Sequence, residues 1–269
     1  MTRAESRIAG LQDQLRRLQR VAIAVSGGID SLSLATLAHR TAGVHSQVFH
    51  AVSPAVPPQA TARVRQLAQQ EGWALTVIDA GEFDDPRYRD NPVDRCYYCK
   101  HGLYGAIAAQ TDDTILSGAN RDDLADYRPG LQAAAEHGVR HPFVEAGFGK
   151  AAIRQLAREL GLGKLAELPA SPCLSSRVET GIPIDGEQLR NINAAELLVA
   201  RALSPRTVRC RIRPRTVEIQ LDTETLDGLR PRQEAALGEA IARLFGHPSN
   251  EIRFRPYAMG SAFLREGRQ

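Results

Sequence analysis

Residues 21–31 are the feature that most constrains the fold of this chain. They begin with Val-Ala-Ile-Ala-Val, a run of apolar or small residues rich in β-branched side chains, which predicts a buried strand. Two glycines follow, and after them leucines and alanines recur at helical spacing. In such a strand–turn–helix unit the backbone N–H groups converge at the helix N-terminus, where the helix dipole adds positive charge. The stretch therefore predicts a phosphate-binding turn.

The turn itself, residues 26–31, has the sequence Ser-Gly-Gly-Ile-Asp-Ser. It differs from the Walker phosphate loop, which is longer and ends in Gly-Lys-Ser/Thr, and it contains no lysine to reach a terminal phosphate. The turn resembles the PP-loop of the ATP pyrophosphatases, enzymes that split ATP between the α- and β-phosphates and adenylate a substrate. An ordinary turn in a sheet that binds no nucleotide is the alternative.

Length and composition bound the class of protein. A chain of 269 residues, 43% hydrophobic and 24% charged, is typical of one large or two ordinary globular domains. No apolar run is long enough to cross a membrane, and residues 1–10 lack the apolar core of a signal peptide, so we expect a cytoplasmic protein. A net charge of +3 says little about nucleic acid.

Strands and helices are predicted to alternate in the first two thirds of the chain. This pattern predicts an α/β, Rossmann-like PP-loop domain with a parallel sheet, whose ligands bind beyond the carboxyl ends of the strands. Three polar loops are expected to meet there: residues 26–31, 51–53 and 118–123. The predicted strands are 21–25, 47–52, 73–78 and 114–117, and the predicted helices include 8–18, 59–71 and one around 153–160.

The pattern changes after about residue 180. A helix at 188–202, strands at 207–212 and 216–221, a helix at 231–245 and a strand at 251–255 predict a smaller α+β domain. We therefore expect a PP-loop domain at residues 1–165, a linker at 166–184 that carries Cys173, and a substrate-binding or oligomerisation domain at 185–269.

Four cysteines in a cytoplasmic protein indicate metal binding or catalysis more than disulfides. Cys96 and Cys99 form a Cys-x-x-Cys pair, which brings two thiolates close enough to share a metal, a cluster or a redox cycle. A zinc site commonly uses two such pairs, and the chain has no second one, although His101 is adjacent. With Cys173 as a third ligand, an iron–sulfur cluster with one open iron is favoured. The alternative is that Cys96 and Cys99 are structural or redox-inert.

The fourth cysteine has a different environment. Cys210 alternates with Arg209 and Arg211 on a predicted strand, so its side chain is expected on the opposite face of the strand. A buried position as a small hydrophobic residue is the prediction.

Three further segments resemble one family. They are residues 91–100 (Asn-Pro-x-Asp-Arg-Cys-Tyr-x-Cys-Lys), 118–130 (Gly-Ala-Asn-x-Asp-Asp-Leu-x-Asp-Tyr-Arg-Pro-Gly) and 172–177 (Pro-Cys-Leu-x-Ser-Arg). With residues 26–31 they resemble, in the same order, the LarE family of ATP-dependent sulfur transferases. These enzymes act on pyridinium-3,5-biscarboxylic acid mononucleotide in the making of the nickel-pincer nucleotide cofactor.

The family has two kinds of members. Some have only the linker cysteine and sacrifice its sulfur, which leaves dehydroalanine. Others have three cysteines that hold a 4Fe-4S cluster, whose open iron can carry a hydrosulfide. This chain is similar to the three-cysteine members, so the resemblance implies that Cys96, Cys99 and Cys173 are metal ligands.

The chain departs from the family pattern in three places. Val-Glu-Thr-Gly follows Arg177 in place of Pro-Tyr-Gly, residues 165–170 lack Trp-Asp-Lys, and residues 254–261 keep Gly-Ser without the preceding Asp-Leu-x-Gly. These departures affect the assignment of the substrate more than the assignment of ATP binding or of sulfur transfer. They leave open a related subfamily that thiolates a different small carboxylate.

Six arginines gather within residues 201–215. On a strand, Arg209, Arg211 and Arg213 share one face, and arginine forks suit phosphate and carboxylate. The resemblance implies that Arg209 and Arg211 bind the substrate phosphate, whereas a solvated cationic face is an alternative for Arg213 and Arg215. RNA binding would require interleaved aromatic residues, and residues 200–216 contain none.

The resemblance also implies roles for the remaining site residues. ATP is expected on the amides of the turn, with Mg²⁺ held by Asp30 and Asp123. Glu196 is expected near the reacting centre, with an exposed helix position as the alternative. The implied ATP-binding residues are Ala24, Ser26, Gly27, Gly28, Asp30, Ser31, Ser53, Gly118 and Asp123; the substrate-binding residues are Ser176, Arg177, Arg209 and Arg211; the catalytic residues are Cys173, Asp30 and Glu196.

We therefore expect an ATP-dependent, AMP- and pyrophosphate-forming sulfurtransferase that converts a substrate carboxylate to a thiocarboxylate. The expected partners are a carboxylated nucleotide, sulfide or another sulfur donor, and further copies of the chain in a homo-oligomer, but no nucleic acid or membrane. Three alternatives stay open. A tRNA thiolase commonly has Lys in place of Ile29, an amidating synthetase of the NAD or GMP type needs no cysteine triad, and a non-enzymatic iron–sulfur or zinc carrier would have a decayed nucleotide site.

Overall fold

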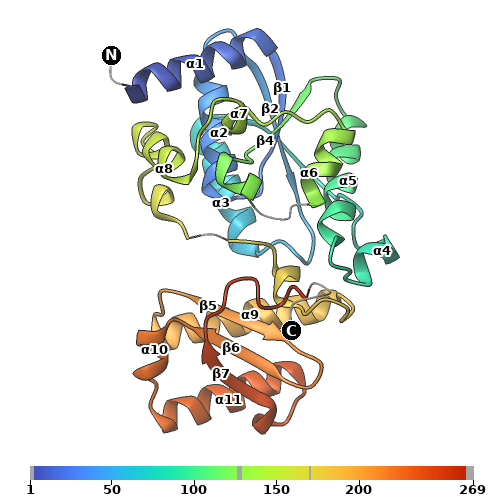
Figure 1. Cartoon of the computed structure of the whole chain (residues 1–269), viewed down its shortest axis with the longest axis vertical. Coiled ribbons are helices and arrows are strands. Elements are labelled where there is room, and N and C mark those ends of the chain that lie inside the picture. The colour runs from blue at the N-terminus through green and yellow to red at the C-terminus, as the bar shows by residue number, and fades with distance from the viewer. Residues whose placement is uncertain (1–2, 126–128, 170, 265–269) are drawn as a thin grey trace. The chain divides into compact units, whose positions relative to one another are not determined.

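The computed structural model describes residues 3–125, 129–169 and 171–264. The chain forms two compact units (Figure 1). The first comprises Met1–Asp85 and Cys96–Ser171, and the second comprises Pro86–Arg95 and Pro172–Gln269. The second unit is thus assembled from two separate stretches of sequence. Asp126, Tyr127 and Arg128 of the family-like motif lie outside the described residues.

A parallel sheet of four strands, in the order β3-β2-β1-β4, forms the centre of the first unit. Strand β1 is internal and helices cover both faces of the sheet, which explains its continuous run of apolar residues. This sheet confirms the predicted α/β fold. The strands are β1 (Arg20–Ala24), β2 (His45–Ala51), β3 (Ala74–Ile78) and β4 (Thr114–Ser117).

Helices of the first unit lie on both faces of its sheet. Their bounds are α1 (Arg3–Leu18), α2 (Ile29–Arg40), α3 (Pro58–Glu71), α5 (Arg95–Ala108), α6 (Pro129–Glu136), α7 (Pro142–Glu145) and α8 (Lys150–Glu159), with short 3-10 helices at Arg121–Ala125 and Gly163–Glu167.

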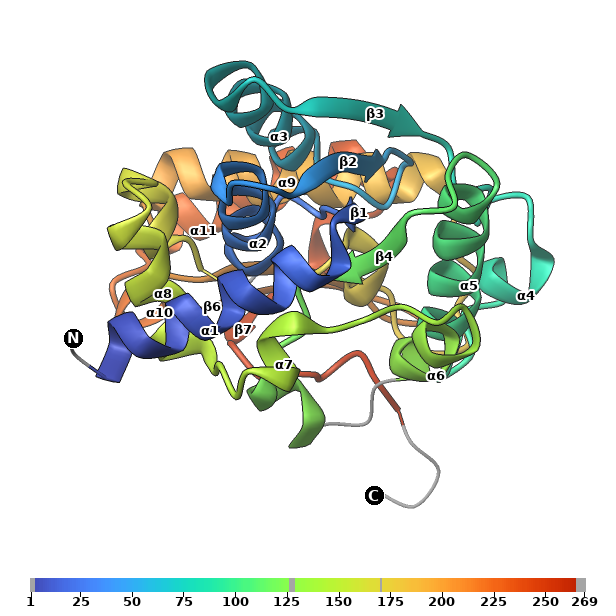
Figure 2. The same ribbon diagram turned by 90° about the horizontal axis from the view of Figure 1, so that it is seen from above.

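Alternate residues of β1 serve two separate cores. Val21 and Ile23 pack with residues of α1, α2, α3 and α8, whereas Ala22 and Ala24 pack with residues of α5 and α6. Figure 2 shows the two groups of helices on either side of the sheet. Because both faces are buried, the carboxyl edge of the sheet is where loops can present polar groups.

The second unit contains a mixed sheet in the order β5-β6-β7, antiparallel between β5 and β6 and parallel between β6 and β7. Helices α9 and α11 pack against this sheet and against each other. Val178 forms a parallel bridge with Ile212 at the end of β5, so the segment after Cys173 extends the sheet. The elements are α4 (Pro86–Arg89), a 3-10 helix (Leu174–Arg177), α9 (Gly186–Leu203), β5 (Val208–Ile212), β6 (Val217–Leu221), α10 (Thr223–Asp227), α11 (Pro231–Phe245), a 3-10 helix (Ser249–Glu251) and β7 (Ile252–Pro256).

None of the helices within the described residues has the length and apolar character needed to span a bilayer.

A close approach of backbones joins the end of β4 to the start of α2. A Cβ atom added at Gly118 would lie 2.7 Å from the Ser31 nitrogen and 2.8 Å from the Ser31 Cα. Only glycine allows this approach, because the atoms in the way belong to the backbone and cannot rotate aside. The loop that follows Gly118 is therefore held against the turn at residues 26–31.

We expect Gly118→Ala to destabilise the first unit by about 1–3 kcal/mol, the usual cost of overpacking. The measurement is the free energy of unfolding in urea. Gly10→Ala is the matched control, because a Cβ at Gly10 on α1 meets nothing within 4 Å. Its expected effect is a gain of up to about 1 kcal/mol in helix stability. Equal stability of the Gly118→Ala variant and the wild type would contradict the close approach.

Candidate functional site

The turn between β1 and α2 is closed by its two serines. Ser31 Oγ accepts the Ser26 N–H at 3.1 Å and donates to the Gly28 carbonyl at 3.1 Å. Gly27 has a φ of +80°, and an added Cβ would lie 2.8 Å from the Ala60 carbonyl oxygen, so glycine is required there. No side chain of the described residues caps α2 at Gly28. The first N–H groups of this helix therefore have the arrangement that favours an anion.

Asp30 lies in the first turn of α2 and faces the loop after β4. Asn120 Nδ2 donates to Asp30 Oδ2 at 3.0 Å, and the Asn120 backbone N–H donates to Asp123 Oδ2 at 3.1 Å. Burial and the negative charge of Asp123 raise the pKa of Asp30 above its ordinary value, against the lowering effect of Asn120. The carboxylates of Asp30 and Asp123 lie close enough for the charge of Asp123 to raise the pKa of Asp30, so a cation beside them would lower the electrostatic energy.

Positive charges of α8 also act on Asp30. Lys150 and Arg154 lower the pKa of Asp30, although less than burial and Asp123 raise it. Asp122 Oδ2 accepts the Lys150 N–H at 2.7 Å, so the acidic loop caps the start of α8. Asn120, Lys150 and Arg154 were not predicted from the sequence as site residues. The available signal was the Lys-x-x-x-Arg spacing at the start of a helix, which puts both cations on one face.

His50 on β2 stabilises the residues that lead into the turn through two side-chain hydrogen bonds. It is fully buried on β2; its Nδ1 lies 2.8 Å from the Val25 carbonyl oxygen and its Nε2 lies 2.9 Å from Thr61 Oγ1. Since a carbonyl only accepts, Nδ1 carries the proton and Nε2 accepts from the Thr61 hydroxyl. Burial lowers the pKa of His50. The neutral ring thus ties the end of β1 to α3.

Two other residues assigned to ATP from the sequence have local partners. The Ala24 side chain packs in the core beneath the sheet. Ser53 Oγ accepts the Ala55 N–H at 3.2 Å within its own turn. Gly118 and Asp123, by contrast, lie beside the turn through the contacts described above.

In the second unit an ion pair orders the residues next to Cys173. Arg177 donates through Nε and Nη2 to the two oxygens of Glu196, at 2.9 and 3.1 Å. Its Nη1 also donates to the Pro172 and Cys173 carbonyls at 2.7 and 3.1 Å. Only 13% of the Glu196 side chain is exposed, so the alternative of an exposed helix position is wrong. The Glu196 carboxylate is already engaged, because it also accepts the Cys210 N–H.

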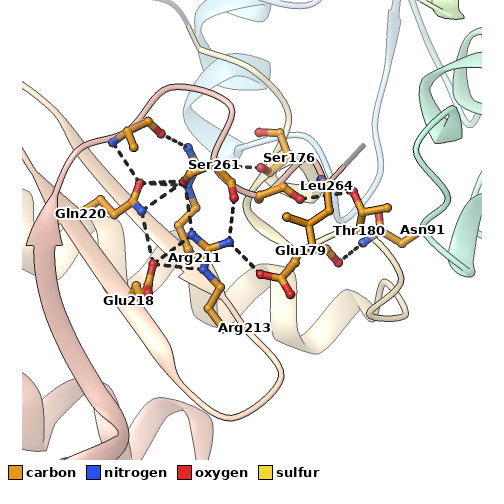
Figure 3. Close-up of polar contacts among 12 residues, drawn as sticks. Asn91, Ser176, Glu179, Thr180, Arg211, Arg213, Glu218, Gln220, Ser261 and Leu264 are labelled. Carbon is orange, nitrogen blue, oxygen red and sulfur yellow. Dashed lines mark hydrogen bonds and ion pairs between the residues drawn. The ribbon is translucent and has the colours of Figure 1, made fainter. Parts of the chain in front are cut away.

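Arg211 is buried without a carboxylate partner among the described residues. Its guanidinium donates to the Ser176 carbonyl at 2.8 Å and to Gln220 Oε1 at 3.2 Å (Figure 3). Burial, followed by the charge of Arg177, lowers the pKa of Arg211 to about 10. Burial likewise lowers the pKa of Arg209, whose guanidinium lies 6.0 Å from the centroid of the Tyr257 ring. At neutral pH both remain charged, which suits an anionic ligand.

Arg213 has a structural environment. It forms ion pairs with Glu179 at 2.8 Å and with Glu218 at 3.0 Å, and only 16% of its side chain is exposed (Figure 3). The alternative of a solvated cationic face is therefore wrong for Arg213, whereas Arg215 is exposed. The physical reason is that two glutamates on neighbouring segments neutralise the Arg213 charge.

The cysteines lie in different surroundings. Cys210 is fully buried, as predicted, and burial followed by the charge of Glu196 raises the pKa of its thiol well above the ordinary range. Cys96 and Cys99 are half-buried in the first turn of α5 and belong to the first unit. Cys173 is half-buried at the start of the 3-10 helix Leu174–Arg177 and belongs to the second unit. Within the part of the chain that the structure describes, no group of three His, Cys, Asp or Glu residues is arranged to hold a metal ion.

Comparison with known proteins supplies relatives along most of the chain. No family model matches. The chain is 36% identical over 241 residues to an uncharacterized protein of Synechocystis sp., and the match covers 88% of both proteins. It is 32% identical over 225 residues to the pyridinium-3,5-bisthiocarboxylic acid mononucleotide synthase of Lactiplantibacillus plantarum, with 82% of this chain and 79% of the synthase covered. It is also 29% identical over 182 residues to an uncharacterized protein of Methanocaldococcus jannaschii, with 66% and 68% covered.

The lowered pKa of His50 predicts a loss of stability in acid. Below the ordinary histidine pKa of 6.5 the unfolded chain binds a proton that the folded ring resists, so stability falls as the pH falls. The slope contributed by His50 is at most about 1.4 kcal/mol per pH unit. Urea unfolding of the wild type and of His50→Gln at about pH 7.5 and 5.5 measures it.

The His50→Gln variant is expected to lose less stability on acidification than the wild type. His45→Gln is the matched control, because it removes an exposed histidine from the start of the same strand and should keep the acid sensitivity. An equal loss in His50→Gln and the wild type would contradict a neutral buried ring.

Proposed function

The chain belongs to the LarE family of sulfur transferases, and we propose that it uses ATP to convert a carboxylate of a small nucleotide substrate into a thiocarboxylate. A carboxylate is a poor acyl donor, because its leaving group would be oxide. Transfer of AMP to one carboxylate oxygen gives an acyl-adenylate, from which AMP leaves readily. The sulfur nucleophile then has a reactive carbon to attack.

The observation that carries the ATP half of the proposal is the uncapped N-terminus of α2 beside two carboxylates. The N–H groups of residues 26–31 would hold the departing pyrophosphate. Asp30 and Asp123 would hold Mg²⁺, which bridges phosphate oxygens and offsets their charge. In the reaction the carboxylate oxygen attacks the α-phosphorus, and the bond from that phosphorus to the pyrophosphate oxygen breaks.

Lys150 and Arg154 would supply the cations that the turn lacks. Their charges already act on Asp30, and the acidic loop fixes the start of α8 through the Lys150 N–H. The pyrophosphate gains negative charge as it leaves, so a nearby ammonium stabilises it more than it stabilises bound ATP. This difference is what accelerates the step.

The second unit would hold the phosphate of the substrate. Arg211 is supported by the Ser176 carbonyl and Gln220 and has no carboxylate of its own among the described residues, so a phosphate would complete its hydrogen bonds. Arg209 would add a second fork from the same strand face. Arg177 is engaged by Glu196, so this pair would orient the segment carrying Cys173 and Ser176.

Sulfur would come from Cys173, or from a 4Fe-4S cluster held by Cys96, Cys99 and Cys173. Three thiols suit iron–sulfur ligation in their chemistry, and Cys96 and Cys99 lie three residues apart on α5, but the described residues do not gather three such ligands at one place. When bound, the cluster would supply sulfide without loss of a cysteine. The sulfur attacks the acyl carbon, the carbon–oxygen bond breaks, and AMP leaves. If Cys173 is the nucleophile, a base must afterwards take its Cα proton while its Cβ–S bond breaks, which releases the thiocarboxylate and leaves dehydroalanine.

The substrate we propose is pyridinium-3,5-biscarboxylic acid mononucleotide. The relative from Lactiplantibacillus plantarum is named for the corresponding bisthiocarboxylic acid, in which both carboxylates are replaced by thiocarboxylates. That product is a sulfur-bearing ligand suited to nickel, so the reaction would serve the making of a nickel-pincer nucleotide cofactor.

Loss of Lys150 tests the ATP half of the proposal. Lys150→Ala should lower kcat/KM for ATP by about ten- to a hundredfold, as expected from one charge-assisted hydrogen bond of ~1.5–3 kcal/mol. Lys164→Ala is the matched control, because Lys164 is an exposed lysine of the same unit. The assay follows AMP and pyrophosphate. Products of ADP and phosphate, or unchanged turnover in Lys150→Ala, would count against the assignment.

Mass spectrometry after reaction distinguishes the two sulfur sources. We expect anaerobically prepared protein to hold about four irons, to form thiocarboxylate from ATP, substrate and sulfide, and to keep its full mass. Cys96→Ala should lose the iron, whereas Cys210→Ala should keep it, because Cys210 is buried elsewhere. Iron-free protein with dehydroalanine at position 173 would overturn the cluster and leave sulfur transfer standing. Absence of thiocarboxylate would overturn the function.

A further inference from the structure

Arg63 of α3 holds one peptide of the phosphate-binding turn. Its side chain is half-buried, and its Nη1 donates to the Gly27 carbonyl at 2.5 Å. Burial lowers the pKa of Arg63, and no carboxylate of the described residues pairs with it. Within the described part of the chain, the bond to Gly27 is the one hydrogen bond of this guanidinium. A half-buried cation whose polar contact is a turn carbonyl requires an explanation.

The start of α3 is itself fixed against the turn. A Cβ added at Gly27 would lie 2.8 Å from the Ala60 carbonyl oxygen, so the two backbones touch. The Thr61 hydroxyl is bonded to the buried ring of His50 at 2.9 Å. Arg63 therefore approaches the turn from a rigid helix and not from a loop, which fixes the direction of its bond.

The peptide that Arg63 holds joins two glycines, so steric hindrance does not fix its orientation. In a planar trans peptide the carbonyl and the N–H point in opposite directions. With the Gly27 oxygen on Arg63, the Gly28 N–H points away from the guanidinium, and its contact to Ser26 Oγ is long, at 3.4 Å. A flip of this peptide would put a carbonyl oxygen in place of the N–H, and a carbonyl oxygen repels phosphate.

We infer that Arg63 is a positioning residue of the nucleotide site, which keeps the Gly28 N–H directed at the phosphates of ATP by holding the Gly27 carbonyl. The inference rests on ATP binding at this turn in the proposed function. A flip rotates φ of Gly28 by roughly 180° from −83°, to a positive value that glycine adopts at no steric cost. Because the charge-assisted bond exists before ATP binds, binding energy is not spent on ordering the peptide.

Isothermal titration calorimetry on the full chain with α,β-methylene-ATP measures binding without turnover, because the bond between the α- and β-phosphates of this analogue is not split. Arg63→Gln removes the charge-assisted bond and is expected to weaken binding about tenfold. Arg63→Lys keeps a cationic donor and should lose less. Arg65→Gln is the matched control, because Arg65 is an exposed arginine of the same helix, and its affinity should equal that of the wild type.

A second background separates the holding of this peptide from a general effect of charge or packing. Gly28→Ala fits the present conformation, since a Cβ there meets Ser26 Oγ at an ordinary 3.4 Å, but it disfavours the positive φ of the flipped peptide. Arg63→Gln should therefore weaken binding by about threefold or less in the Gly28→Ala background. If Gly28→Ala itself prevents binding, nuclear magnetic resonance of the ligand-free protein replaces this measurement, and the Gly28 amide signal should shift or broaden in Arg63→Gln.

Each result bears on the inference. Wild-type affinity in Arg63→Gln overturns it and leaves ATP binding standing, as does an equal loss in Arg65→Gln. An undiminished loss in the Gly28→Ala background, or an unchanged Gly28 amide signal, also overturns it. Unfolding of Arg63→Gln, seen by circular dichroism, would make the role of Arg63 structural and overturn the inference. Wild-type protein that does not bind the analogue overturns the ATP half of the proposed function and the inference together.

Discussion

The close approach of Gly118 to the Ser31 nitrogen is the contact on which the candidate nucleotide site depends. It holds the loop after β4 against the first turn of α2. Asn120 can therefore donate hydrogen bonds to both Asp30 and Asp123, from its side-chain amide and its backbone N–H respectively. Two carboxylates then lie together at a helix N-terminus that no described side chain caps. A phosphate-bound cation would relieve their repulsion, and the N–H groups would bind the phosphate oxygens. The close pair of carboxylates is therefore electrostatically unfavourable without a ligand and becomes favourable when a phosphate-bound cation lies between them.

The candidate substrate site of the second unit is built from positively charged arginines, whereas the nucleotide site of the first unit contains two carboxylates. Arginine guanidinium groups gather around the segment that carries Cys173, and the glutamates neutralise only some of them. Glu196 engages Arg177, and Glu179 and Glu218 engage Arg213. Among the residues that the structure describes, Arg211 has only neutral acceptors. An unneutralised buried arginine is a strong site for phosphate, because its hydrogen bonds act in a low dielectric.

The sequence predicted the parallel sheet, a second small sheet and most helices, because buried strands and amphipathic helices leave clear periodic patterns. It also predicted the burial of Cys210 from alternation alone. It did not predict α5, whose cysteines and tyrosines give a weak helical pattern, or that residues 86–95 belong to the second unit. The Glu179–Arg213 pair was missed because a contact between distant residues leaves no local signal, whereas Lys150 was missed although its spacing from Arg154 at a helix start was visible in the sequence. The ATP, substrate and cluster roles of the site residues remain predictions.

Oxygen labelling tests most directly the central claim that a carboxylate is adenylated and then thiolated. Substrate labelled with ¹⁸O in its carboxylates would be incubated with ATP and sulfide, and the AMP and pyrophosphate analysed by mass spectrometry. The bridging carboxylate oxygen leaves with AMP when sulfur displaces it, so one ¹⁸O should enter AMP for each thiocarboxylate formed, and none should enter pyrophosphate. Thiocarboxylate formed with unlabelled AMP would contradict this account.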